Sequence, residues 1–338
     1  MNIKTEISKI HYTKENTGAL FSLLCFGSRF YSLASGLKNY LYDNKILTPQ
    51  KVDAFVVSVG NLTTGGVGKT PVVAELVKRY MSKGKKVAIV SRGYGGKLKG
   101  VNVISDGNEL YFDSQTAGDE PYWLGTNTKA VVITSPVRYE GAKLAVDKYG
   151  VDVVILDDGF QHRKLHRDLD VVLIDSEKRF GNEKQLPAGP LRESIDGLRR
   201  ADKIVVVSKN VTHYGASEYA EALIEKYKKP VAICKAMPDV VYNIFDESDI
   251  LENGQQVIAF SGIGQPEQFY KFLKPFDVIK TVDFDDHHDY TQKDMDNLQL
   301  YKLPLVTTEK DAVKCKSLKF TQKIYALKLK MTIEDVKW

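Results

Sequence analysis

The sequence predicts an α/β protein: a three-layer α/β/α domain with a mainly parallel sheet, a smaller C-terminal α/β domain and an N-terminal amphipathic helix. From residue 54 onward, apolar β-branched runs alternate with helix-spaced segments, which is typical of a doubly wound sheet. This rhythm changes near residue 230, around two prolines, and a second strand–turn–helix unit follows. We expect segments at 1–46, 47–232 and 233–338.

Length and composition limit the class of protein. The 338 residues suffice for two α/β domains, and 43% hydrophobic with 27% charged residues is ordinary for a globular chain. A net charge of +5 suits an anionic membrane surface or phosphorylated ligands, but no concentrated basic tail of the nucleic-acid-binding kind is present. Three widely spaced cysteines and a polar N-terminus favour a reducing cytosolic setting without a cleavable signal peptide.

Residues 19–47 form an apolar, aromatic helix interrupted by Arg29 and Lys38. Its longest uncharged stretch is too short, and too rich in Ser and Gly, to span a bilayer. One interpretation is an interfacial helix, with aromatic rings at the lipid headgroups and basic residues toward anionic lipid. The other is a helix packed on its own domain, and composition does not choose between them.

A strand, a glycine-rich turn and a helix follow one another between residues 54 and 78. Backbone N–H groups of such a turn can surround phosphate oxygens, and the helix N-terminus adds partial positive charge. The pattern therefore predicts a nucleotide phosphate loop of the P-loop NTPase type, although a turn that only connects strand to helix is the alternative. The loop would comprise Thr63, Thr64, Gly65, Gly66, Val67, Gly68, Lys69 and Thr70.

Two residues at the end of this loop carry its chemistry. We expect Lys69 to reach the β- and γ-phosphates of ATP and the Thr70 hydroxyl to bind Mg²⁺. Pro71 fits the first helical turn, because its missing N–H has no helical partner there. The strict phosphate-loop pattern has glycine where this chain has Thr63.

The strands that follow end in charged residues. Asp119 and Glu120 are adjacent, a strand ends near Arg138, and four apolar residues lead into Asp157 and Asp158. A carboxylate at the C-terminal end of a buried parallel strand, downstream of a phosphate loop, is a typical Mg²⁺ ligand. It could instead cap the next element.

Two polar loops remain open to more than one interpretation. Arg192, in the proline-rich loop LPAGPLRE, could stabilise phosphate charge or form a surface ion pair. The string DDHHD at 285–289 could bind a metal, but an isolated string of this kind is usually a solvated turn.

Together the motifs resemble the tetraacyldisaccharide 4′-kinase family of lipid A biosynthesis. They occur in one order from about residue 20 to the C-terminus, and in that family the first glycine of the phosphate loop is also replaced. The matching stretches are S-V-G-N-L-T-x-G-G-x-G-K-T-P (58–71), S-R-G-Y (91–94), G-D-E (118–120), D-D-G-F-Q-H (157–162), G-P-L-R-E (189–193), F-S-G-I-G (260–264), D-H (286–287) and T-T-E-K-D (307–311).

The resemblance implies a reaction and a location. MgATP would phosphorylate the 4′-hydroxyl of a tetraacylated glucosamine disaccharide 1-phosphate, forming lipid IVA, at the cytoplasmic face of the bacterial inner membrane. The N-terminal helix would dock peripherally on the lipid surface, and no obligate protein partner or nucleic acid is implied. The family's catalytic acid falls on Asp119 and its histidine partner on His287. The residues around nucleotide and metal would be Glu120, Arg138, Asp157, Asp158, Gln161 and His162.

Two rival functions share these features. Another small-molecule or lipid kinase would differ only in its acceptor. A nucleotide-switched membrane assembly factor would hydrolyse ATP under control of a protein partner and form no phosphorylated lipid. The acid pair in G-D-E, with a histidine from the second domain, favours phosphoryl transfer.

Overall fold

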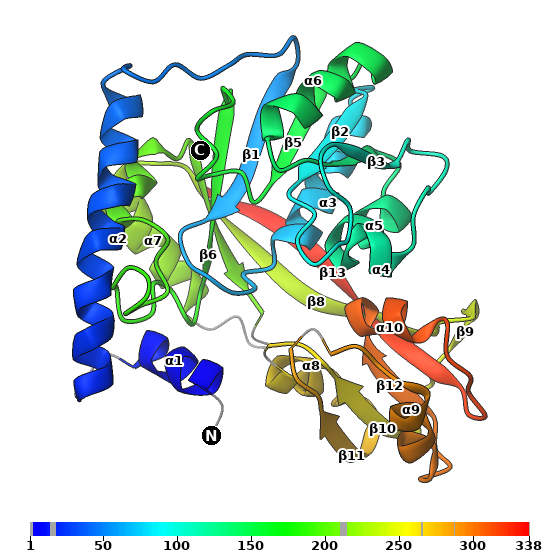
Figure 1. Ribbon diagram of the computed structural model, residues 1–338. Helices are drawn as coiled ribbons and strands as arrows, with labels where there is room; N and C mark the ends of the chain where they lie inside the picture. The colour runs from blue at the N-terminus through cyan, green and yellow to red at the C-terminus, as the bar shows by residue number, and fades with distance from the viewer. Residues whose placement is uncertain (1–2, 14–17, 210–214, 265, 287, 338) are drawn as a thin grey trace.

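The computed structural model describes residues 3–13, 18–209, 215–264, 266–286 and 288–337 (Figure 1). Two helices, α1 (Ile3–Tyr12) and α2 (Ala19–Asp43), precede a segment that we call the phosphate-loop unit. Its elements are β1 (Phe55–Asn61), α3 (Lys69–Met81), β2 (Val87–Ser91), β3 (Asn102–Ser105), α4 (Ser114–Ala117), α5 (Asp119–Asn127), β4 (Val131–Thr134), α6 (Arg138–Tyr149), β5 (Val153–Asp157), β6 (Leu169–Asp175), η1 (Ile195–Arg200), β7 (Lys203–Ser208) and α7 (Ala216–Tyr227).

A smaller group of elements completes the chain. The long strands β8 (Val231–Asn243) and β13 (Ile324–Lys337) flank a segment that we call the C-terminal unit. This unit contains β9 (Asp246–Ile250), β10 (Gln256–Ser261), α8 (Pro266–Phe272), β11 (Asp277–Asp283), α9 (Gln292–Gln299), β12 (Leu305–Thr308) and α10 (Glu309–Cys315).

The strands form one continuous sheet in the order β11-β10-β12-β13-β8-β7-β6-β1-β5-β2-β4-β3, with β9 paired to β8. Most neighbours are parallel; the exceptions are β3 with β4, β8 with β13, and β8 with β9. The predicted α/β fold with a mainly parallel sheet is therefore confirmed. Its strands read as continuous apolar runs because helices cover both faces.

Each unit has three layers. In the phosphate-loop unit, α3 and α5 pack on one face of the sheet, whereas α6 and α7 pack on the other. In the C-terminal unit, α8 covers one face and α9 and α10 cover the opposite one.

The ribbon of β8 and β13 joins the two units (Figure 1). The first residues of β8, Val231 to Lys235, pair with β7, and the first residues of β13, Ile324 to Leu327, pair with β12. The predicted boundary after residue 232 lies inside β8, so the sheet is continuous across it. The division at 1–46, 47–232 and 233–338 stays a prediction.

Parallel pairing fixes the place of the site. β1 lies between β5 and β6, and both pairings are parallel. The C-terminal ends of these strands therefore meet at one edge of the sheet, which is where ligands bind in open α/β sheets. The loop after β1 and the acids at the end of β5 are brought together by this topology alone.

Candidate active site

The predicted phosphate loop connects β1 to α3. Gly65 and Gly68 have φ angles of +99° and +95°, a left-handed conformation that side chains rarely adopt, and Gly68 caps the N-terminus of α3. The loop backbone is also held from outside. The Thr64 N–H donates to the Pro190 carbonyl at 2.7 Å, and Lys209 Nζ donates to the Gly66 carbonyl at 2.5 Å. Glycine conformation and these external bonds fix the loop beside a helix N-terminus, as an anion site requires.

Lys69, the first residue of α3, lies in a cluster of charged side chains. Its Nζ atom is 3.1 Å from Asn61 Oδ1 and 3.4 Å from Asp158 Oδ1. The other Asp158 oxygen accepts a hydrogen bond from Arg192 at 2.7 Å. Burial alone would raise the pKa of Asp158, but the charges of Lys69 and Arg192 outweigh it and hold that pKa below its ordinary value. The structure thus brings three predicted site residues into direct contact.

Asp157 ends β5 and is 3% exposed. Its Oδ1 atom has no hydrogen-bond partner among the described residues. Burial first, and then the negative charge of Glu120, raise the pKa of Asp157, while Lys69 and Arg138 oppose the rise. A buried carboxylate oxygen without a hydrogen-bond partner is suited to meet a cation.

The donor set here fits magnesium. Carboxylate oxygens of Asp157, Asp158 and Glu120, with the Thr70 hydroxyl in the first turn of α3, are the hard ligands that Mg²⁺ prefers. In the described part of the chain, no group of three or more His, Cys, Asp or Glu side chains is placed so that it could hold a metal ion by itself. Magnesium in kinases usually keeps waters and binds one or two carboxylates plus substrate phosphates, so a complete protein cage is not required.

Arg138 and His162 differ in charge at neutral pH. Arg138, at the start of α6, is 2% exposed and donates to the Ser135 carbonyl at 2.7 Å. Burial lowers its pKa to about 10, against the opposing charges of Asp157 and Asp158, so it stays positive. Burial and then the charge of Arg138 lower the pKa of His162 to about 4, so this imidazole is neutral.

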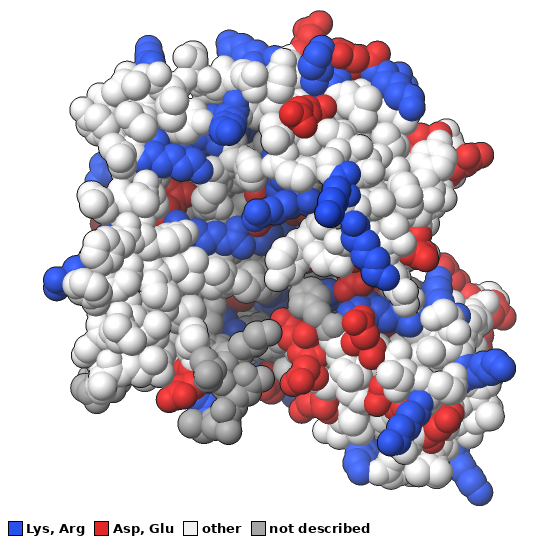
Figure 2. Space-filling model, in the orientation of Figure 1, with Lys and Arg blue, Asp and Glu red and all other residues white. Residues whose placement is uncertain are grey.

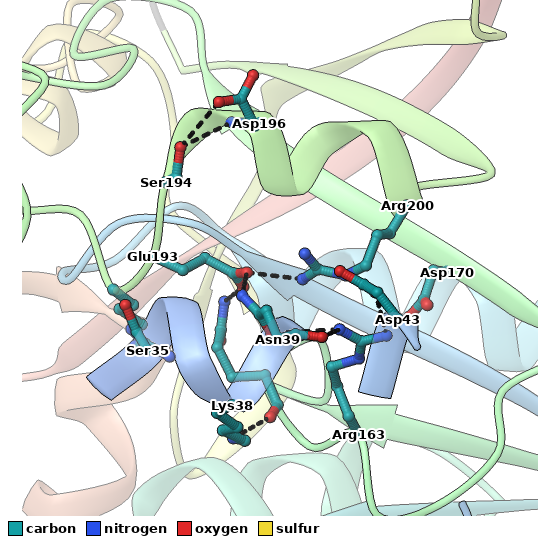
Figure 3. Close-up of polar contacts among 12 residues, drawn as sticks. Ser35, Lys38, Asn39, Asp43, Arg163, Asp170, Glu193, Ser194, Asp196 and Arg200 are labelled. Carbon is teal, nitrogen blue, oxygen red and sulfur yellow. Dashed lines mark hydrogen bonds and ion pairs between the residues drawn. The ribbon is translucent and has the colours of Figure 1, made fainter. Parts of the chain in front are cut away.

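Gln161 connects the end of β1 to α2 through Glu193. Its Nε2 donates to the Asn61 carbonyl at 3.0 Å and to Glu193 Oε1 at 2.9 Å. Glu193, 2% exposed, also accepts from Arg200 at 2.7 Å and from Asn39 of α2 at 2.9 Å (Figure 3). Sequence reasoning assigned no role to Asn61 or Glu193, although both occur in quoted motifs, S-V-G-N-L and G-P-L-R-E.

α2 packs on the protein through its small and polar side chains. Ser28 donates to the Gln185 carbonyl at 2.7 Å, and Tyr31 donates to the Arg192 carbonyl at 3.0 Å. The outward face is apolar, with side chains between 57% and 72% exposed at spacings of three and four residues. We call this set the α2 stripe: Leu23, Phe26, Phe30, Leu33, Leu37 and Tyr40.

α2 is long and apolar enough to cross a membrane by length and composition, with only 6% of its most apolar part buried. The prediction that this helix is too short to span a bilayer, which rests on its longest uncharged stretch, is therefore wrong as far as length and composition decide. Length and composition alone do not distinguish a spanning helix from one that lies on a surface.

A basic hollow of about 160 Å³ lies between α2 and the phosphate-loop unit. Figure 2 shows Lys and Arg side chains in a band across the middle of this face of the molecule. The hollow touches the site described above through Arg138 and Gln161. Its other charged or ionisable lining residues are Lys38, His162, Arg163 and Lys164.

Asp119, the first residue of α5, faces the C-terminal unit. Its Oδ2 atom is 3.1 Å from Nζ of Lys314, a residue of α10 that sequence reasoning missed and that no local signal singles out. The predicted partner His287 lies outside the described residues. Its neighbour His288 stacks on Phe284 with 4.7 Å between the ring centroids, and its Nε2 atom lies 3.2 Å from Asp294 Oδ2. The His288 ring is therefore packed against its own loop and the start of α9.

Known proteins resemble this chain over most of its length. The family described as tetraacyldisaccharide-1-P 4′-kinase matches residues 20–338. The tetraacyldisaccharide 4′-kinase of Halothermothrix orenii is 37% identical over 317 residues, covering 86% of this chain and 82% of that protein. The enzyme of the same name from Geobacter sulfurreducens is 37% identical over 306 residues, covering 87% and 84%. The crystal structure of LpxK from Aquifex aeolicus in complex with ATP, 35% identical, superposes with a TM-score of 0.77 over 94% of this chain and 96% of that one.

Proposed function

The chain belongs to the tetraacyldisaccharide-1-P 4′-kinase family, and we infer that it is such a kinase. It transfers the γ-phosphoryl group of ATP to the 4′-hydroxyl of a tetraacylated glucosamine disaccharide 1-phosphate, forming lipid IVA. The observation that carries this function is the cluster of Lys69, Asp158 and Arg192 beside a glycine loop. Asp119, the proposed proton acceptor, precedes Glu120, whose charge acts on Asp157 at the end of β5. A nucleotide-switched assembly factor has no use for that proton acceptor.

The phosphate half of the reaction uses charge already in place. Backbone N–H groups of residues 63–68 and Lys69 bind the ATP phosphates, and Arg192 and Arg138 offset the charge of the transferring group. Mg²⁺ would be held by Thr70, Asp157, Asp158 and Glu120. The chemistry it supplies when bound is neutralisation of phosphate oxygens. Support for this assignment is the unpartnered Asp157 Oδ1 atom and its raised pKa.

The acceptor half needs a proton acceptor. The 4′-oxygen attacks the γ-phosphorus, the bond from that phosphorus to the β,γ-bridging oxygen breaks, and ADP leaves. Asp119 accepts the hydroxyl proton as the new bond forms. His287 is the proposed partner of Asp119. Because Asp119 contacts the C-terminal unit through Lys314, the relative position of the two units affects this step.

The acceptor's anionic and acylated parts suit the surroundings of α2. The basic hollow beside Lys38 and Arg163 offers positive charge for the 1-phosphate. The α2 stripe, apolar and outward, suits acyl chains and the lipid surface at the cytoplasmic face of the inner membrane. We propose peripheral docking, because the opposite face of α2 is bonded to the protein.

Product analysis tests the function directly. The protein is incubated with ATP, Mg²⁺ and the tetraacylated disaccharide 1-phosphate, and the lipid is examined by mass spectrometry. One added phosphate at the 4′-position is expected. ATP hydrolysis without a phosphorylated lipid would favour the assembly factor, whereas phosphorylation of other acceptors alone would favour a different lipid or sugar kinase.

A further inference from the structure

Lys314 lies between the two units and contacts both sides of the boundary. Its Nζ atom is 3.1 Å from Asp119 Oδ2 in the phosphate-loop unit and donates to the His288 carbonyl at 3.1 Å in the C-terminal unit. The side chains of Lys314 and Asp119 are only 9% and 19% exposed. One largely buried ammonium therefore joins the proposed proton acceptor to the loop that carries position 287.

The helix α10, which carries Lys314, is firmly attached to the C-terminal unit. Thr308 caps α10, and its hydroxyl donates to Asp311 Oδ2 at 2.8 Å. Asp311, 1% exposed, also accepts the Gly262 N–H at 3.1 Å, which ties α10 to the loop after β10. Ala312 and Cys315 complete the attachment by packing in the core of the C-terminal unit. Lys314 therefore moves together with the C-terminal unit as a whole.

The loop on the other side of Lys314 is also fixed at one point. The His288 ring stacks on Phe284 and makes an edge contact with Tyr290. The same ring contacts Asp294, which belongs to the capping box of α9. The packed ring of His288 and the bond from Lys314 to its carbonyl thus hold the backbone at His288 in place.

We propose that Lys314 is a positioning residue for phosphoryl transfer, which holds the Asp119 carboxylate in a fixed position relative to the backbone at His288. This inference rests on the proposed function of Asp119. It gives the stretch T-T-E-K-D a physical role, since these residues build the start of the helix that presents Lys314. A small displacement of a reacting group lowers the rate strongly, so the ion pair should affect turnover more than ATP binding.

The test compares Lys314→Met, Lys314→Arg and Asp119→Ala, alone and combined, in the full chain. We expect Lys314→Met to lower kcat about tenfold to a hundredfold, with KM for ATP changed less than about twofold. Lys314→Arg should stay within about fivefold of wild type, because guanidinium can reach both partners. In the Asp119→Ala background, Lys314→Met should cost less than about threefold more, because the pair acts as one unit.

Gln268→Ala is the matched control. Gln268 of α8 makes another contact between the units, to Glu177 at 3.1 Å, without touching Asp119. Hydrogen exchange should quicken at 119–124 and 284–290 in Lys314→Met and stay unchanged in Gln268→Ala. Unchanged exchange at both segments in Lys314→Met would contradict the inference.

Three kinetic outcomes would overturn the inference while leaving the proposed function in place. They are a Lys314→Met kcat within about threefold of wild type, an equal loss in both backgrounds, and a loss in Gln268→Ala as large as that in Lys314→Met. A fully active Asp119→Ala single variant would instead overturn the role of Asp119 as proton acceptor, so the two failures are distinguishable.

Discussion

The phosphate-loop unit and the C-terminal unit each contain a carboxyl group, Asp158 and Glu309, and the pKa values of these two groups are shifted in opposite directions. In the phosphate-loop unit, Asp158 lies between Lys69 and Arg192, and its pKa is lowered despite its burial. In the C-terminal unit, Glu309 lies against the Tyr242 hydroxyl at 3.4 Å, and burial raises its pKa to about 7. Two neighbouring cations thus keep Asp158 ionised, whereas the burial of Glu309 outweighs the charge of Lys328.

The difference indicates a division of labour. Preorganised opposite charges suit a ligand with several phosphate oxygens, because they need no rearrangement when it binds. Glu309, by contrast, lies where burial favours its protonated form. The contact between Asp119 and Lys314 lies where the two units meet, so it depends on both.

The largest expected effect comes from removing Lys69 from its cluster with Asp158 and Arg192. Lys69→Ala should lower kcat/KM for ATP by about a thousandfold or more, because both ground-state and transition-state phosphate contacts are lost. Steady-state kinetics would measure it. Lys78→Ala, an exposed lysine of the same helix, is the matched control and should be silent. Retention of a tenth of wild-type kcat in Lys69→Ala would refute the phosphate-loop assignment.

Asp119→Ala tests the boundary between the units. A lost general base should cost about a hundredfold or more in kcat, with little change in ATP affinity. Single-turnover phosphorylation and nucleotide titration would separate the two quantities. Rescue by excess Mg²⁺ would show instead that Asp119 is a metal ligand, and the proton-accepting role would then belong elsewhere.

The α2 stripe tests whether lipid binding belongs to the phosphate-loop unit alone, since the described contacts of α2 to the rest of the fold are with that unit. Changing Phe26, Phe30 and Leu33 together to serine should release the protein from anionic vesicles while ATP affinity is kept. Vesicle sedimentation measures the release. Leu300→Ser, which changes a 77% exposed leucine of the C-terminal unit, is the control. Undiminished sedimentation of the triple variant would mean that the stripe does not bind lipid.

The smallest expected effect concerns pH and the C-terminal unit. Because the folded-state pKa of Glu309 is raised to about 7, the folded protein keeps this proton longer than the unfolded chain. The stabilisation is complete below the ordinary glutamate pKa and is lost as the pH rises through about 7. Glu309→Gln should therefore be more stable than wild type by about 1–3 kcal/mol at pH 8 and nearly equal at pH 4. Urea unfolding at both pH values would measure it, and an unchanged difference between them would contradict the raised pKa.

Much of the site around Lys69 and the end of β5 could be predicted from local sequence. A buried strand, glycines, Lys69 and a helix are contiguous, and parallel pairing then requires the end of β5 to lie beside them. The acid pair Asp157 and Asp158 is recognisable for the same reason. The role of Asn61 could not be read in this way, because its bond to Lys69 depends on how the side chains turn inside the loop.

The sequence by itself determined the alternation of strands and helices, the phosphate loop and the order of the motifs, because these depend on neighbours in the chain. Only the tertiary structure decided which face of α2 is bonded to the protein and which is exposed. It also decided that β8 and β13 pair into one ribbon, and that Lys314 meets Asp119. Each of these contacts joins segments far apart in sequence, and its geometry depends on the packing of every element between them.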